Sequence, residues 1–207
     1  MGLARLMIVQ GNFQQADNLL YDADGYLPKD HPGRAELEQN RAGTDEAMNR
    51  YDSAIARLRK CIELQPSKRE EFVGAIAIIH LKNERLEQGL EVLAEVPDSR
   101  HPDVLSAHCY AARIRAKRDP ESEAMDRALE LYRATIAELP EDRIYRLVME
   151  FAELVLDKVS PAQAASQRKL LEEAVALVER QVKLRAECPA GYWNLSRLFR
   201  LLGDAGK

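Results

Sequence analysis

One spacing of residues recurs along the chain and restricts its fold more than any other feature. In the stretch GNFQQADNLLYDADGYLP, residues 11–28, Ala16 is followed by Leu20 four positions later and by Pro28 twelve positions later. Proline cannot donate the helical hydrogen bond and disfavours helix in the residue before it, so the pattern predicts a helix that ends near its proline. The pattern returns as Ala54, Leu58 and Pro66 and as Ala128, Tyr132 and Pro140, and weaker copies begin at Gly89 and Ala174.

A second pattern lies between these copies. It consists of a large residue, a large and a small residue three and four positions on, and another large residue seven positions on. Steps of three and four place such side chains on one face of a helix, and the small residue lets a neighbouring helix approach closely. The copies are Val73, Ile76, Ala77 and His80; Ala107, Tyr110, Ala111 and Ile114; Val148, Phe151, Ala152 and Val155; and Tyr192, Leu195, Ser196 and Phe199.

The composition agrees with a helical chain. Alanine, leucine, glutamate and arginine dominate, and glycine and proline lie mostly between the periodic segments. These residues favour helix, and no run of alternating β-branched residues predicts a strand. The sequence therefore predicts an all-α fold in which two kinds of helix alternate.

Because the two patterns alternate in phase, the chain resembles the tetratricopeptide repeat (TPR) family, whose 34-residue unit contains two antiparallel helices, A and B. The resemblance runs from Leu3 to about Gly203. It implies an α-solenoid, a right-handed superhelix of antiparallel helix pairs. We expect a single array over residues 1–207, with approximate repeats at 1–28, 31–66, 69–100, 103–140 and 143–188 and a terminal helix at 189–203.

Two segments depart from the pattern. GRAELEQNRAGTDEA, residues 33–47, offers few large apolar residues where a helix A should pack, and Gly43 interrupts it, so we expect a short, exposed or displaced helix there. The terminal helix is apolar most of the way round and should be covered by something else. Either further repeats of a longer protein or the end-to-end packing of a second copy could cover it. We favour the first because the sequence begins and ends inside repeats.

Several function classes are disfavoured. The 30 basic and 34 acidic residues give a net charge of −4, which argues against a nucleic-acid surface. Few aromatic residues lie near the basic run RIRAKR at 113–118, which argues the same way. No segment is apolar enough to insert into a membrane, and no signal peptide is apparent. We therefore expect a cytoplasmic protein, or a periplasmic one if an upstream signal has been removed.

The chain also lacks the motifs of an enzyme. It has no glycine-rich phosphate loop, HExxH or GxSxG, and its histidines are scattered. His108 and Cys109 are adjacent on a predicted helix, so their side chains do not face each other. Cys61, Cys109 and Cys188 are far apart and are expected to be buried thiols. We predict no catalytic residue, no cofactor and no metal site.

The resemblance to TPR proteins implies a protein or peptide partner that is bound in a concave groove lined by helix A. The groove of the subtype that binds chaperone tails carries a clamp of lysines, asparagines and an arginine, but this chain has Gly74, Ala75 and Ile78 at the corresponding places. That partner class is therefore not expected. The predicted groove residues are Ile78, Leu81, His108, Arg115, Arg146, Met149, Glu153, Trp193, Asn194, Arg197 and Arg200.

This groove is increasingly basic toward the C-terminal half, which suits a partner segment with apolar side chains and an acidic group or C-terminal carboxylate. The favoured function is a non-enzymatic protein-interaction scaffold. The alternative is a helper segment of a larger multidomain enzyme or export protein whose active part lies outside this chain. Self-association through the helix at 189–203 is a third, less favoured reading.

Overall fold

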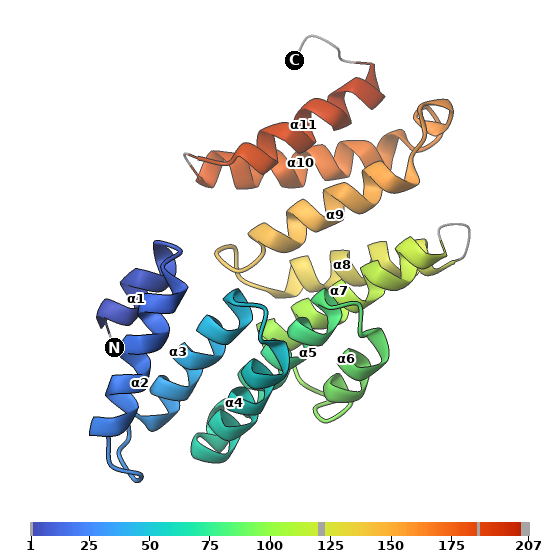
Figure 1. Cartoon of the computed structure of the whole chain (residues 1–207). Helices are drawn as coiled ribbons and strands as arrows, with labels where there is room; N and C mark the ends of the chain where they lie inside the picture. The colour runs from blue at the N-terminus through green and yellow to red at the C-terminus, as the bar shows by residue number, and fades with distance from the viewer. Residues whose placement is uncertain (1, 120–122, 186, 204–207) are drawn as a thin grey trace. The chain divides into compact units, whose positions relative to one another are not determined.

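The computed structural model describes residues 2–119, 123–185 and 187–203, and these residues form α-helices, two short 3₁₀ turns and no strand (Figure 1). The all-α prediction is confirmed. The chain folds into two compact units, Met1–Ala107 and His108–Lys207, and the division falls inside one helix, α7 (Pro102–Arg118). The single array over the whole chain stays a prediction.

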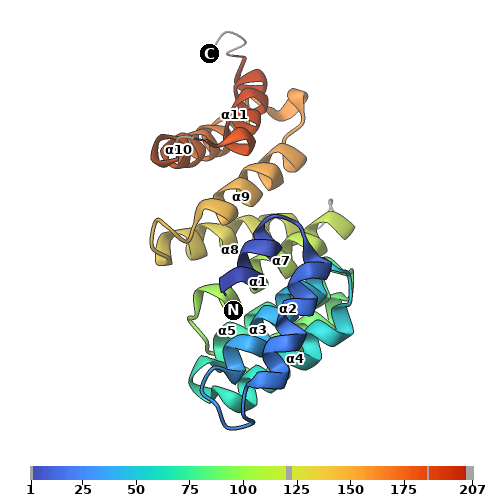
Figure 2. The same cartoon turned by 60° about the vertical axis from the view of Figure 1, so that its left-hand side comes forward.

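The first unit is a series of helix pairs. In chain order its helices are α1 (Gly2–Val9), α2 (Phe13–Tyr26), α3 (Arg34–Ala47), α4 (Tyr51–Leu64), α5 (Arg69–Lys82), α6 (Leu86–Leu93) and the first part of α7, with a 3₁₀ turn at Pro66–Lys68. Each helix from α1 to α5 packs on the next one along the chain, and α1 also contacts α3. Figure 2 shows α1 to α5 packed side by side. The odd-numbered helices correspond to the predicted helices A and the even-numbered helices to the predicted helices B.

The second unit continues the same alternation. It contains the rest of α7, α8 (Ala124–Glu138), α9 (Tyr145–Lys158), α10 (Arg168–Leu184) and α11 (Pro189–Leu202), with a 3₁₀ turn at Pro161–Gln163. Helix α9 packs on α8 and α10, and α11 packs on both α9 and α10. Tyr132, Phe151 and Leu171 are among the largest fully buried side chains of its core.

The recurring small residue lies at the crossing of the two helices in a pair. All four alanines of the pattern are completely buried. The fifth copy is Gly89, where a Cβ atom would lie 2.8 Å from the Leu81 side chain, so no larger residue fits without a shift. These residues therefore set how closely helix A and helix B approach.

The turns from helix A to helix B are also repeated in the first unit. Gly11, Asn49 and Glu84 all adopt positive φ, at 75°, 60° and 61°. The amide of the following residue donates to the carbonyl oxygen five positions back in each case: Asn12 to Met7 at 2.8 Å, Arg50 to Asp45 at 2.7 Å and Arg85 to His80 at 3.0 Å. This is the Schellman arrangement that ends helices, and its recurrence identifies three structurally equivalent pairs.

The expectation for residues 33–47 is wrong. Helix α3 is a regular helix of 14 residues, and half of its side chains are buried. The sequence pattern missed it because several of the buried side chains are polar rather than apolar. They include Glu38, Asn40 and Asp45.

The buried acids of α3 are neutralised by basic residues of α4 and of the turn before it. Arg57 of α4 donates to a Glu38 oxygen at 2.9 Å and to an Asp45 oxygen at 2.6 Å. Lys60 also pairs with Glu38, and Arg50 lies 2.7 Å from Asp45. Charge pairing thus replaces part of the apolar packing at this helix crossing, since a buried charge is tolerated only when it is paired.

This cluster makes the first unit sensitive to acid. Burial alone would raise the pKa of Glu38, but hydrogen bonds from Lys60 and Arg57 outweigh it and hold the pKa below its ordinary value of 4.5. Ionised Glu38 therefore stabilises the fold above about pH 4.5, and this contribution is lost as the pH falls through the lower, folded-state pKa. We expect Glu38→Gln to lose stability at neutral pH and to show a flatter decline on acidification, as measured by urea unfolding across the acid range. An equally steep decline in the variant would contradict this role.

Gly43 is a residue whose replacement should stabilise the protein. It lies inside α3, is exposed, and has nothing within 4 Å of the place where a Cβ would stand. Because glycine costs conformational entropy in a helix, we expect Gly43→Ala to raise the free energy of unfolding by about 1 kcal/mol. Urea denaturation measures this effect, and a destabilised variant would show that the local packing is misassigned.

Candidate partner-binding face of α9 and α11

Three of the predicted groove residues have buried side chains. Leu81, on α5, packs against Gly89 at the helix crossing. Met149 of α9 and Asn194 of α11 join their two helices, because the Asn194 side-chain amide lies 3.4 Å from the Met149 carbonyl oxygen and donates to it. The structure thus gives these three residues packing roles, and we leave them out of the proposed site. The sequence pattern missed this because a neighbouring helix A covers part of the face that the pattern leaves open.

The other predicted residues keep at least part of their surface. Ile78 on α5 and His108 on α7 are half-buried, and burial lowers the pKa of His108. Arg115 of α7 is exposed. The remaining five lie on two helices that pack against each other within the second unit: Arg146, Glu153, Trp193, Arg197 and Arg200. We call these five residues the α9–α11 face.

Part of this face is occupied by ion pairs between α7 and α9. Arg113 pairs with Glu153 and lies 3.7 Å from Glu150, to which Arg146 donates at 2.8 Å. The Arg146 guanidinium also lies over the Tyr110 ring, 5.5 Å from its centroid. These contacts hold Arg146 and Glu153 in place and satisfy much of their charge.

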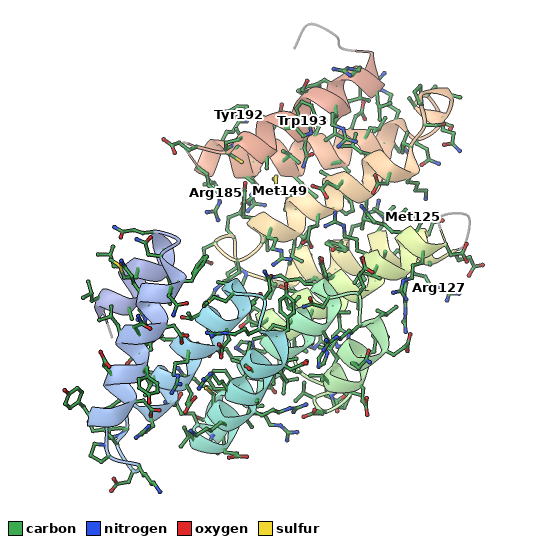
Figure 3. The ribbon with its side chains drawn as sticks, viewed as in Figure 1. Met125, Arg127, Met149, Arg185, Tyr192 and Trp193 are labelled. Carbon is green, nitrogen blue, oxygen red and sulfur yellow. The ribbon has the colours of Figure 1, made fainter. Side chains whose placement is uncertain are left out.

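Helix α11 differs from α9 in the surroundings of its exposed aromatic residues and of its two arginines. Trp193 and the neighbouring Tyr192 are 65% and 57% exposed (Figure 3). Neither Arg197 nor Arg200 has an ion-pair partner among the residues that the structure describes. An exposed indole beside two arginines without partners can accept an apolar group and a carboxylate at the same time.

The start of α11 is fixed by close packing against the preceding helix and its loop. A Cβ atom at Gly191 would lie 2.5 Å from both the Cys188 sulfur and the Val182 side chain. Nearby, the Arg185 guanidinium lies over the Tyr145 ring, 4.5 Å from its centroid. Close packing therefore positions the start of the helix that carries Trp193, two residues further on.

Ion pairs join successive repeats, and the sequence patterns did not predict them. Arg113 and Glu153 are 40 residues apart, as are Arg133 and Glu173. Pairs in the first unit span similar separations, such as Lys82 with Glu46 at 36 residues. Because equivalent helices of neighbouring repeats lie side by side, a search for opposite charges one repeat apart could have found such pairs.

The cavities of each unit lie beside the helices B, where no site was predicted. In the second unit a cavity of about 350 Å³ lies between α8 and α10, and its lining includes Ile136, Leu139 and Leu177. Arg133 of α8 and Glu173 of α10 also line it and are joined by two hydrogen bonds of 2.7 Å. In the first unit a cavity of about 570 Å³ lies between α2 and α4 and is lined in part by Tyr21, Arg34 and Lys60. Both are crossed or lined by charged groups that already have partners.

The cysteine thiols, which could act as nucleophiles, are packed in the protein core. All three cysteines are buried and unbonded, as predicted. Burial raises the pKa of the Cys61 and Cys109 thiols to about 11, and the Cys109 sulfur faces the Thr135 hydroxyl at 3.3 Å. Within the described ranges, no group of three or more acidic, histidine or cysteine side chains is arranged to hold a metal ion, and no helix has the length and apolarity to cross a membrane.

Comparison with known proteins identifies the fold. No protein-family model and no curated protein matches the chain. Among solved structures, the chain is similar to the nearly identical TPR-like repeats from Podosopora anserina that are described as those of a kinesin light chain. The identity is 20%, the TM-score is 0.56, and the match covers 90% of this chain and 95% of that one. A variant of the same repeats matches with 21% identity, a TM-score of 0.56, and 90% and 94% coverage.

These similarities place the chain in the class of all-α helical-repeat proteins. More particularly, it has the TPR-like repeat fold that the two alternating sequence patterns predict.

Proposed function

We propose that this chain is a non-enzymatic scaffold that binds a protein partner on the α9–α11 face. The partner segment would present apolar side chains together with an acidic side chain or a C-terminal carboxylate. The observation that carries this proposal is the presence of Arg197 and Arg200, without ion-pair partners among the described residues, on the same helix as the exposed Trp193.

Electrostatics favours α11 over the other predicted groove residues. Arg146 already donates to Glu150, and Glu153 already pairs with Arg113, so an incoming carboxylate would compete with existing pairs there. On α11 a guanidinium can form a bidentate pair with the carboxylate without breaking another contact. A tryptophan next to such a pair shields it from water and adds apolar contact area, as binding hot spots do. His108 and Arg115 of the same unit remain proposed flanking contacts, and Ile78 remains a proposed contact of the first unit.

Cross-linking of the purified chain in a lysate of its source organism tests the proposal. A double variant, Trp193→Ala with Arg197→Ala, should lose the captured partner. Trp193 is exposed and Arg197 is half-buried with no ion-pair partner among the described residues, so the helix content should be unchanged by circular dichroism.

A matched double variant serves as the control. Tyr21→Ala with Arg127→Ala removes an exposed aromatic residue of α2 and an exposed arginine of α8, neither of which belongs to the α9–α11 face. This variant should capture the partner as the unmodified chain does. Equal capture by both double variants would place the binding site elsewhere and contradict the proposal.

A further inference from the structure

The first helix presents an apolar stripe to solvent. Leu3, Leu6 and Val9 are 57%, 49% and 84% exposed, whereas Ala4 is buried. Their spacing of three residues places the exposed side chains on one face of α1, opposite the side that packs on α2 and α3. On α2, Tyr26 is 88% exposed as well. An apolar stripe of this kind is typical of a surface that contacts another protein.

The charges of α1 and α2 complement those of α11. Helices α1 and α2 contain three aspartates and one basic residue, Arg5, which pairs with Glu36 at 3.3 Å. Asp17 and Asp24 have arginine partners, but the exposed Asp22 has no ion-pair partner in the part of the chain that the structure describes. Helix α11 contains two arginines and no acidic residue. We call Leu3, Leu6, Val9, Asp22 and Tyr26 the α1–α2 surface. It combines exposed apolar side chains with a carboxylate that has no ion-pair partner among the described residues, which is the chemistry proposed above for the partner of α11.

The packing inside each unit provides a precedent for such a contact. Helix α11 packs on α9, and α1 packs on α3, so one helix A lies directly on the next helix A in both units. Placing α11 of one molecule on α1 of another would repeat this arrangement. Tyr192 and Trp193 of α11 are exposed, as are Leu6 and Val9 of α1, so both surfaces can take part in such a contact.

We infer that the partner of α11 is the α1–α2 surface of a second copy of this chain. The inference rests on the proposed function, since α11 is the binding helix in both. The two surfaces are different, so the contact is heterologous, and copies can add to one another without closing into a dimer.

Sedimentation velocity over a wide concentration range tests this association. The unmodified chain should form species that grow beyond the dimer as the concentration rises. Val9→Glu and Trp193→Glu should each weaken association by about tenfold or more, because each places a charge in the apolar contact. An equimolar mixture of the two variants should form a dimer and nothing larger. The intact α11 of the Val9→Glu chain can bind the intact α1 of the Trp193→Glu chain, and the altered helices at the two outer ends cannot add a further copy.

Tyr21→Glu is the matched control. Tyr21 is also an exposed aromatic residue of α2, but it lines the cavity that faces α4, so this variant should associate as the unmodified chain does. Added salt should weaken the association, since Asp22 pairs with arginine across the contact. Circular dichroism confirms that every variant is folded.

Two results would overturn the inference. One is an unmodified chain that stays monomeric at all concentrations. The other is a mixture of the two variants that forms no dimer although the unmodified chain associates, which would indicate a symmetric contact. A third outcome separates the two proposals. If the unmodified chain is monomeric, and its Trp193→Ala, Arg197→Ala variant no longer captures a protein that the unmodified chain captures from the lysate, then the self-association is wrong and the proposed function stands.

Discussion

Leucine in place of Ala54 should lower the free energy of unfolding by about 3 kcal/mol, because the added carbon atoms must fit into a filled helix crossing. Ala54 is completely buried on α4, the helix that packs most extensively on α3. The two backbones would have to move apart, and the paired charges of Glu38 and Arg57 would be disturbed with them. Urea denaturation followed by circular dichroism measures this loss.

Ala56 offers a control on the same helix. It is exposed, two residues from Ala54, so Ala56→Leu adds the same atoms where there is room for them. We expect a change within about 0.5 kcal/mol. Equal losses for the two variants would show that the small residue of the pattern does not set the distance between the helices.

Arg57→Ala should be nearly as damaging, at about 3 kcal/mol, because it removes a shared partner of two buried acids. Glu38 and Asp45 are almost completely buried, and each would keep only its second basic neighbour, Lys60 or Arg50. A buried carboxylate that loses a hydrogen bond carries a large desolvation cost. The measurement is again urea denaturation at neutral pH.

Arg59→Ala on the same helix provides the comparison. Arg59 pairs with Glu95 at the surface, with hydrogen bonds of 2.8 Å and 2.5 Å, and its side chain is 40% exposed. Exposed pairs contribute little because solvent and salt screen them, so we expect a loss of under about 1 kcal/mol. A larger loss for Arg59→Ala than for Arg57→Ala would contradict the role assigned to the buried cluster.

Most of the fold could be predicted because its determinants are local. The steps of three and four residues identify helical faces, and the alanines at 16, 54, 128 and 174 mark the crossings that the structure shows to be filled. Helix α3 could not be predicted in the same way. Its burial depends on Arg57 and Lys60, which are separated from Glu38 by about one helix and a turn, and a pattern of apolar residues does not register them.

The candidate site was less predictable because it depends on contacts between repeats. Periodicity assigns Met149 and Asn194 to an open face, yet each is covered by the other's helix. Periodicity also cannot separate arginines with partners from those without, such as Arg146 from Arg197. This distinction requires the spacing of opposite charges as well, because Arg146 has Glu150 four residues further along α9, whereas α11 contains no acidic residue.

The most direct test of partner binding is selection of random peptides with free C-termini against the immobilised chain. We predict that enriched peptides combine large apolar residues with an acidic residue or the terminal carboxylate, and that they lose binding to the Trp193→Ala, Arg197→Ala variant. Binding should also weaken as salt is added, because it depends on pairing with arginine. Enriched peptides that bind this variant as tightly as the unmodified chain, or that lack any acidic preference, would contradict the proposed role of α11.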